Sequence, residues 1–251
     1  MIYTEREEKI LELLKDTSSV DVKTLTRVLY TSEATVRRDL RKLEQKGLIL
    51  RSHGKAMRVS AYADQNVGFD LREHLLSPVK QNLAKAAVER FAAEGSVVML
   101  DASSTAMCAV QYLAQKKDVI VITSGLKTLG FLSQTELKFF STGGMAINRS
   151  ASFVGQTAIA AVNAFNADVA FVSCHGLSED GFATDTSIAE NDVRLAMLNR
   201  SKRKVLLVDS SKINKGCWNN LCHISFFDDV VCDQELPEPI LSSVKNFHLI
   251  K

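Results

Sequence analysis

The segment that most constrains this chain is residues 31–55, where an amphipathic helix is followed by a short basic strand. Val36, Leu40 and Leu43 stand at i, i+4 and i+7, so they form one apolar stripe along a helix. The other side of that helix carries polar and basic residues: Thr35, Arg37, Arg38, Arg41 and Lys42. This pattern predicts a helix that packs on a small core and presents arginines to its surroundings.

Both ends of this helix carry capping signals. Ser32 precedes the periodic residues, where its hydroxyl can accept from a free backbone N–H. Gly47 follows the last turn and suits a left-handed C′ position. Residues 48–51 then predict a strand, and residues 52–55 predict its turn. The segment is therefore expected to be a helix followed by a wing.

Two further helices are predicted before it. Thr4 and Glu7 have the spacing of a capping box, followed by amphipathic residues such as Ile10. Asp21 can cap a second, short helix. Three helices with a tight turn between the last two predict a helix-turn-helix unit, which binds duplex DNA. The residues expected to contact DNA are Ser32, Thr35, Arg37, Arg38, Arg41, Lys42, Arg51, His53 and Lys55.

The charge distribution favours the same interpretation. Residues 27–58 hold nine lysines and arginines against three acidic residues, whereas the whole chain carries only +2. Local positive charge of this kind is typical of phosphate binding. The alternative is a solvated charged helix within a helical hairpin, but the caps, the turn and the wing together favour DNA binding.

Composition places the remainder among folded globular domains. The chain has 251 residues, of which 46% are hydrophobic and 24% are charged. A DNA-binding module of residues 1–57 and a linker of residues 58–78 leave residues 79–251 for one full-sized core. No apolar run reaches the roughly 18 residues that a membrane helix needs, so no membrane partner is expected.

The cysteines indicate a reducing compartment. Five cysteines are scattered along the chain without a C-x-x-C pair, and no signal peptide is recognisable, so we expect a cytoplasmic protein. The spacing of Cys217, Cys222 and His223 matches no common zinc pattern. We therefore expect no metal site and no cofactor.

From residue 79 onward, predicted helices alternate with apolar strands. The strands are expected at residues 96–101, 119–123, 137–144, 169–173 and 205–209. Strands that are apolar throughout and separated by helices predict a parallel sheet covered on both faces. The fold class is therefore α/β, with a Rossmann-like second domain.

Small and polar residues follow each predicted strand. They occupy residues 101–105, 123–125, 141–144, 173–176 and 209–212. Each segment alone reads as an ordinary turn with a helix cap. Because the carboxyl ends of parallel strands meet at one edge of the sheet, the set predicts a pocket for a small phosphorylated polyol.

The first module resembles the DeoR family of bacterial transcriptional repressors. The family core Thr-[Val/Ile]-Arg-Arg-Asp-Leu matches residues 35–40, and its Leu-Glu and Gly-Leu-Ile match residues 43–44 and 47–49. The family continues into Arg-x-His-Gly-Gly-Ala, which residues 51–56 match except that Lys55 replaces the second glycine. Lysine at this position can change the backbone conformation of the wing turn, and it adds a candidate phosphate contact.

The remainder is similar to the sensor domain of that family, whose fold is like that of ribose-5-phosphate isomerase. Its Asp-x-Gly-Thr-Thr loop falls on residues 101–105, with Ser103 in place of glycine, and its Thr-Asn falls on residues 123–124, with Ser124 in place of asparagine. The resemblance implies these effector-binding residues: Asp101, Ser103, Ser104, Thr105, Ser124, Gly143, Gly144, Glu190 and Lys212.

The resemblance implies a repressor of a carbohydrate-utilisation operon that acts as a homodimer or homotetramer and is controlled by a phosphorylated sugar. No catalytic residues are expected. An enzyme is the competing hypothesis, since Asp101, Asp185, Glu190 and Lys212 could supply acid–base groups, and a constitutive DNA binder is a third. The acidic residues from Asp180 to Asp192 could also hold a cation, although a solvated acidic loop is the expected interpretation.

Overall fold

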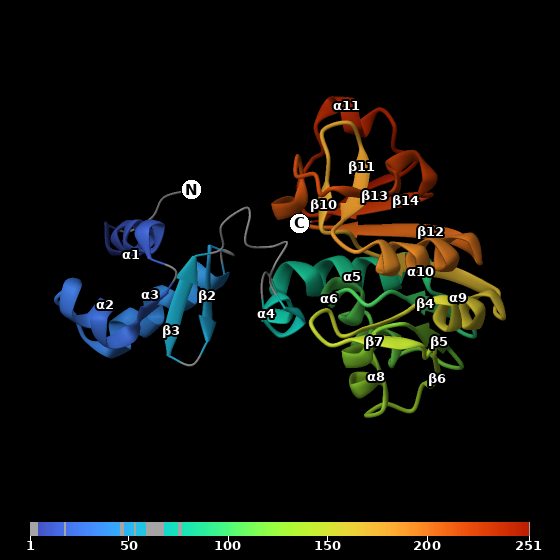
Figure 1. Ribbon diagram of the computed structural model, residues 1–251, viewed down its shortest axis with the longest axis horizontal. Coiled ribbons are helices and arrows are strands. Elements are labelled where there is room, and N and C mark those ends of the chain that lie inside the picture. The colour runs from blue at the N-terminus through green and yellow to red at the C-terminus, as the bar shows by residue number, and fades with distance from the viewer. Residues whose placement is uncertain are drawn as a thin grey trace. The chain divides into compact units, whose positions relative to one another are not determined.

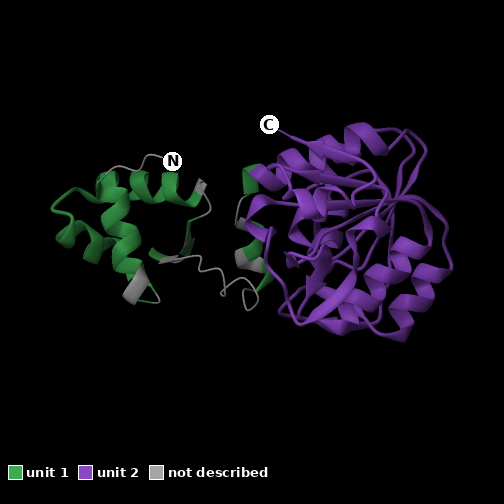
Figure 2. Ribbon diagram, turned by 90° about the horizontal axis from the view of Figure 1, so that it is seen from above, with its two compact units in different colours: residues 1–78 green, residues 79–251 purple. Residues whose placement is uncertain are grey.

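The computed structural model in Figure 1 describes residues 5–17, 19–45, 48–52, 54–58, 68–74 and 77–250. The chain forms two compact units, Met1–Pro78 and Val79–Lys251, which Figure 2 shows in different colours. No helix among the described residues is both long enough and apolar enough to cross a bilayer.

The first unit is a winged helix-turn-helix, as predicted. Its helices are α1 (Glu5–Asp16), α2 (Val22–Val28), α3 (Glu33–Gln45) and α4 (Phe69–His74), and its strands are β1 (Val20–Asp21), β2 (Ile49–Ser52) and β3 (Lys55–Arg58). The strands form an antiparallel sheet in the order β1-β3-β2. Helix α4 lies inside residues 58–78, which were predicted to be a linker.

Capping and burial in this unit follow the sequence pattern. Val36, Leu40 and Leu43 are all buried in a core shared with α1 and α2. The Ser32 hydroxyl accepts from the backbone N–H of Thr35 at 3.3 Å, so the N-cap prediction for α3 is confirmed. Asp21 likewise caps α2 by accepting from the backbone N–H of Thr24 at 2.8 Å. The predicted caps at Thr4 and Gly47 lie outside the described residues.

The second unit is built on a parallel sheet. In the part of the chain that the structure describes, seven strands pair in the order β15-β14-β12-β9-β4-β5-β6, and every neighbouring pair is parallel. The strands are β4 (Val97–Leu100), β5 (Ile120–Thr123), β6 (Lys138–Ser141), β9 (Ala167–Val172), β12 (Ser201–Val208), β14 (Asp229–Cys232) and β15 (Phe247–Leu249). The five predicted strands are all present, and β14 and β15 were not predicted.

Helices cover both faces of this sheet, which explains why its strands are apolar throughout (Figure 1). Along β4, Val98 and Leu100 belong to one core and Met99 belongs to the other. The first core receives side chains of α5 (Ser77–Phe91), α6 (Ser104–Met107), α7 (Val110–Leu113) and α8 (Leu126–Leu132). The second receives side chains of α9 (Gln156–Asn163), α10 (Ile188–Asn199) and α11 (Glu238–Leu241).

Smaller elements depart from the sequence prediction. The helix expected near residues 105–115 is divided into α6 and α7, because the N–H groups of Cys108 and Ala109 bond three residues back instead of four. Two antiparallel sheets were missed: β7 (Met145–Ile147) with β8 (Ser152–Val154), and β10 (Gly176–Leu177) with β11 (Phe182–Asp185) and β13 (Asn219–His223). Short 3₁₀ helices, η2 (Ser210–Lys212) and η3 (Ile224–Phe226), complete the unit.

The strand order places a topological switch point between β4 and β9. From β4 the chain adds β5 and β6 on one side, and then returns to add β9, β12, β14 and β15 on the other. The loops after β4 and β9 therefore leave neighbouring strands toward opposite faces of the sheet. In open α/β sheets a crevice for ligands forms at such a point.

Candidate functional site

Helix α3 exposes the basic residues that the sequence assigns to DNA. Arg38, Arg41 and Lys42 are exposed on the face opposite the buried stripe. Arg37 is also exposed, and its Nη2 lies 3.3 Å from Glu33, one helical turn earlier. An exposed pair of this kind contributes little stability, so Arg37 can exchange Glu33 for a phosphate at low cost.

The wing differs in detail from the sequence prediction. Arg51 donates to Glu44 through Nε at 2.8 Å and Nη2 at 2.5 Å, and both side chains are partly buried. Arg51 is therefore engaged in joining β2 to α3, which the sequence did not indicate. In the turn, Gly54 has φ +76 and Lys55 begins β3. Only Gly54 needs the left-handed conformation, so lysine is tolerated at position 55. His53 lies outside the described residues.

One acidic residue of α3 has a structural role that the sequence analysis missed. Asp39 is 1% exposed, and its carboxylate accepts from Nε of Arg6 at 2.8 Å. This ion pair ties α3 to α1. It sets the orientation of the helix that presents Arg38 and Arg41.

In the second unit, the loop after β4 is organised around Asp101. The backbone N–H and the hydroxyl of Ser103 both donate to Asp101 Oδ1, at 3.1 and 2.5 Å. The Ser103 hydroxyl also caps α6 by accepting from the backbone N–H of Ala106 at 3.0 Å. The side chain of Ser103 is thus engaged within the loop itself.

Ser104 and Thr105 are buried hydroxyl residues beside a lysine. The Oγ1 of Thr105, a side chain that is 1% exposed, has no hydrogen-bond partner among the described residues. The Ser104 hydroxyl accepts from Nζ of Lys80, which lies in the first turn of α5 and is itself buried. A buried donor without a partner is unfavourable unless a ligand or water satisfies it. Lys80 precedes Ser104 by 24 residues, and no local pattern predicts that it reaches this loop.

The loops after β9 and β12 bring a second lysine to the same edge. Lys212 of η2 donates through Nζ to the Ser173 hydroxyl at 2.9 Å and lies 3.5 Å from Asp209. The backbone N–H of Ser173 donates in turn to Asp101 Oδ2 at 3.3 Å. Burial by itself raises the pKa of Asp209, but the charges of Lys212 and Lys80 outweigh it and lower that pKa.

Arg194 of α10 connects three of the carboxylates. Its guanidinium, 4% exposed, donates from Nε to Asp101 at 2.8 Å and from Nη1 to Asp185 at 2.5 Å. Nη2 lies 3.3 Å from Glu190, and Nη1 also donates to Asn191 at 3.0 Å. Burial alone lowers the pKa of Arg194, but the three carboxylates raise it further than burial lowers it. The guanidinium therefore stays charged.

Two of the four acidic residues between Asp180 and Asp192 are not solvated, which corrects the sequence interpretation for them, whereas Asp180 and Asp192 are exposed as expected. Asp185 and Glu190 are buried, at 0% and 6% exposure. Asp185 accepts from Arg194 and lies 2.8 Å from Nδ1 of His175. The carboxylates lie inside the unit because Arg194 is available to compensate their charge, a pairing that composition alone does not reveal.

Ser124 and Glu190 are joined through β8. The backbone N–H of Phe153 donates to the carbonyl of Ser124 at 2.7 Å. The hydroxyl of Ser152 donates to Glu190 Oε1 at 2.8 Å. The structure thus links the predicted residues Ser124 and Glu190, and Arg194 extends that link to the loop of Asp101.

The glycine pair after β6 packs against the end of β8 through Gly144. Gly144 has φ +105, and a Cβ on it would lie 2.6 Å from the carbonyl oxygen of Val154. Gly143 also has a left-handed φ, of +57, and its N–H donates to the hydroxyl of Ser141. Both glycines therefore have a backbone reason to be glycine, and β5 separates their strand from β4.

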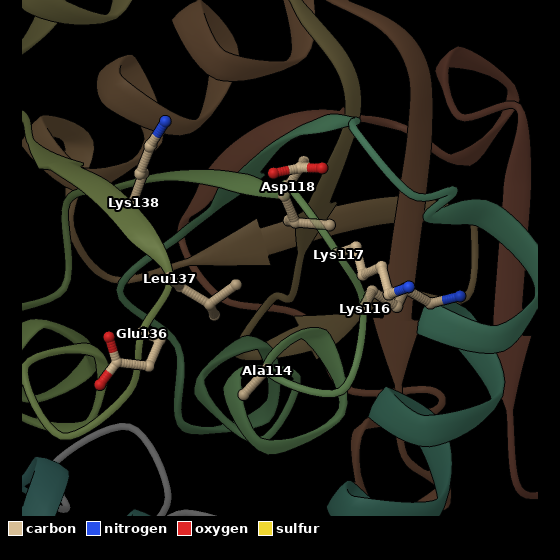
Figure 3. A pocket seen from close by; sticks show the side chains of 8 residues that line it. Ala114, Lys116, Lys117, Asp118, Glu136, Leu137 and Lys138 are labelled. Carbon is tan, nitrogen blue, oxygen red and sulfur yellow. The ribbon is translucent and has the colours of Figure 1, made fainter.

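A cavity of about 340 Å³ lies at the opposite edge of the sheet (Figure 3). Its lining residues immediately precede β5 and β6, including Lys117, Asp118 and Leu137. The predicted effector loops instead follow the carboxyl ends of the strands. In Figure 3 the amino groups of Lys117 and Lys138 point away from each other, so they do not converge on one ligand.

Sequence profiles of two domains match the chain. The DeoR-like helix-turn-helix domain matches residues 6–61, and the DeoR C terminal sensor domain matches residues 77–234. The matches cover the winged helix and most of the α/β unit, including the loops that hold Asp101 and Lys212.

Several regulators are similar over nearly the whole chain. The helix-turn-helix transcriptional regulator YulB of Bacillus subtilis is 31% identical over 92% of this chain and 87% of its own length. The glycerol-3-phosphate regulon repressor of Escherichia coli is 25% identical, with 99% and 98% covered. The L-fucose operon activator of Escherichia coli is 28% identical, with 91% and 94% covered.

Among solved structures, ribose 5-phosphate isomerase A from Methanocaldococcus jannaschii aligns with a TM-score of 0.41 at 19% identity, over 55% of this chain and 56% of that one. The two sequence profiles describe domains of one family, and the relatives cover nearly the whole chain. The chain belongs to the DeoR family of DNA-binding transcriptional regulators.

Proposed function

We propose that this protein represses a carbohydrate-utilisation operon and releases its operator when a phosphorylated sugar binds at the switch point of the second unit. In this proposal residues 1–57 bind DNA and residues 79–251 sense the effector. The observation that carries it is the buried Thr105 hydroxyl without a partner, next to Ser104 and Lys80.

The charge of this edge suits a phosphate. Lys80 and Lys212 come from different elements, and the charges of both lower the pKa of Asp209. Hydroxyl donors and ammonium groups together are the usual partners of a phosphate ester. The carboxylates around Arg194 are suitable partners for the hydroxyl-bearing part of the ligand, since carboxylates accept hydrogen bonds from sugar hydroxyls. The names of the relatives, one a glycerol-3-phosphate regulon repressor and one an L-fucose operon activator, support a carbohydrate role.

Control of DNA binding requires the effector to favour one arrangement of the DNA-binding units over another. We propose a homodimer or homotetramer that presents two α3 helices to half-sites separated by about one helical turn or a multiple of it. A ligand shifts such an equilibrium only through its differential affinity for the two states, and typical couplings are about 1–3 kcal/mol per site.

The test combines effector and DNA titrations on the full chain. Ser104→Ala with Thr105→Ala should weaken the binding of glycerol 3-phosphate, ribose 5-phosphate or fructose 6-phosphate, whichever of them binds the wild-type protein. Affinity for the upstream DNA of the coding gene should stay the same. Ser133→Ala with Thr135→Ala is the matched control, because these residues follow α8 and precede β6 at the other edge of the sheet. An unaltered effector titration in the first variant would overturn the assignment of the site.

A turnover assay with the same sugar phosphates distinguishes the regulator from an enzyme. We expect no turnover above background, because each of the three carboxylates around Arg194 is engaged in an ion pair with it. A fold shared with an isomerase does not confer its activity. A rate above background that is lost in Asp185→Asn would favour catalysis.

A further inference from the structure

His175 lies at the switch point, in the loop of residues 173–176 that the sequence predicts to line the pocket, but the family resemblance implies no role for it. It follows Ser173, whose N–H donates to Asp101 and whose hydroxyl accepts from Lys212. Its side chain is 11% exposed, so the ring is largely enclosed but still reaches the surface of the unit. Its Nδ1 lies 2.8 Å from Asp185 Oδ2.

The surroundings of Asp185 hold that carboxylate in one orientation. Oδ1 accepts from the backbone N–H groups of Thr186 and Ser187, at 2.6 and 3.1 Å. Oδ2 accepts from Arg194 Nη1 at 2.5 Å. With both oxygens occupied, Asp185 cannot turn away from His175, and the orientation of the imidazole is set by a buried network.

This contact also selects the tautomer of His175. Burial by itself raises the pKa of Asp185, but Arg194 and His175 outweigh it and keep the carboxyl group ionised. An ionised carboxylate can only accept, so Nδ1 of His175 carries the proton. In the neutral ring Nε2 is then an acceptor. Within the described part of the chain, no group forms a hydrogen bond with Nε2.

We propose that Nε2 of His175 accepts a hydrogen bond from a hydroxyl of the effector, and that Asp185 and Arg194 are the positioning residues that aim it. The inference rests on the proposed function and deepens it. The effector must then carry a phosphate, which binds beside Lys80, Ser104 and Thr105, and also a free hydroxyl on its carbon chain. A site built to bond a hydroxyl discriminates strongly against analogues that lack it.

Two substitutions separate this role from a structural one. In His175→Asn the side-chain amide can replace Nδ1 as the donor to Asp185, but no atom remains at the position of Nε2. In His175→Gln the amide reaches the position of Nε2. A residue that only supports Asp185 should tolerate asparagine better than glutamine, whereas a residue that binds a hydroxyl should show the reverse.

The probes are pairs of ligands with and without hydroxyls: glycerol 3-phosphate with propyl phosphate, and ribose 5-phosphate with pentyl phosphate. Calorimetric titration of the full-length protein gives the preference for the hydroxylated member of each pair. In the wild-type protein we expect that preference to be about tenfold or more for the pair that fits, as for one hydrogen bond of about 1.5 kcal/mol. His175→Asn should lower the preference by about tenfold and leave the affinity for the alkyl phosphate unchanged, and His175→Gln should restore part of the lost preference.

The outcomes are distinguishable. A preference that is undiminished in His175→Asn overturns the role of His175 while the proposed function stands. An equal loss of affinity for both members of a pair makes His175 a structural residue and also overturns the inference. If the wild-type protein binds no probe, the proposed function fails and the inference fails with it. Should His175→Asn not fold, His175→Ala takes its place, and an undiminished preference in that variant overturns the inference. An alkyl phosphate that the wild-type protein binds as tightly as the matching sugar phosphate overturns it as well.

Discussion

The guanidinium of Arg194 in α10 lies 2.8 Å from the carboxylate of Asp101 at the end of β4, although 93 positions separate the two residues. Both side chains are buried, at 4% and 0% exposure. The pair joins the loop after β4 to a helix that covers the other core of the sheet. The same guanidinium also pairs with Asp185 and Glu190, so one buried cation bonds three buried carboxylates.

Removal of that guanidinium should destabilise the second unit strongly. Arg194→Met leaves three buried carboxylates without their shared partner, and breaking a buried ion pair from one side costs about 3–5 kcal/mol. Urea denaturation followed by circular dichroism measures the free energy of unfolding. Lys202→Met is the control, because Lys202 forms an exposed pair with Asp168 and should cost no more than about 1 kcal/mol. Equal losses in the two variants would contradict the role assigned to Arg194.

The stability of the second unit should fall in acid. The pKa of Asp185 is lower in the folded protein than its usual value of 3.8, so its stabilising contribution is complete above that value. The contribution is lost as the pH falls below about 4 toward the folded pKa, at up to about 1.4 kcal/mol per pH unit. Asp209 adds a loss of the same sign because its pKa is lowered too.

Denaturant titrations between pH 5 and about pH 3 should therefore show a shallower slope for Asp185→Asn than for the wild-type protein. The slope should not vanish, because Asp209 remains. Identical slopes would show that Asp185 does not bind its proton more weakly in the folded state.

Two glycines of the second unit should respond in opposite ways to alanine. Gly144→Ala places a Cβ 2.6 Å from the Val154 carbonyl at a φ of +105, so we expect a loss of about 1–3 kcal/mol. Gly130 lies inside α8 with open space around its Cβ position, and Gly130→Ala should gain about 0.5–1 kcal/mol. Thermal unfolding of both variants tests the prediction, which a stable Gly144→Ala protein would refute.

DNA binding should depend on the exposed face of α3. Arg38→Ala should remove one contact to a phosphate or to a base. If the contact is to a phosphate, the slope of the logarithm of the operator-binding constant against the logarithm of the salt concentration should become shallower by about one. If Arg38 reads a guanine, the loss should be about 1–3 kcal/mol and confined to one base position. Lys9→Ala in α1 is the control, since Lys9 is an exposed lysine that pairs with Glu5 one helical turn earlier. Equal operator affinity at matched salt would remove Arg38 from the interface.

Local sequence patterns predicted the elements that depend on neighbouring residues. The apolar stripe of α3, the caps at Ser32 and Asp21, and the buried strands of the parallel sheet all follow from spacings of a few residues. Polar residues after successive strands also predicted the edge at which the loops of Asp101 and Lys212 meet, because parallel strands share the direction of their ends. The family motifs lie in these same segments.

The tertiary structure alone decided which side chains meet. Lys80 and Arg194 reach the switch point from α5 and α10, and nothing in their local sequence marks them. The loop of His175 was predicted to line the pocket, but its contact with Asp185 was not. A charged residue in a helix is ordinarily exposed, and only the packing of distant segments shows that Arg194 is buried among carboxylates. The order of the strands, which creates the switch point, is likewise set by long-range pairing. The sequence by itself therefore determined the two kinds of unit and their elements, while the charge network that organises the candidate site depends on contacts across the fold.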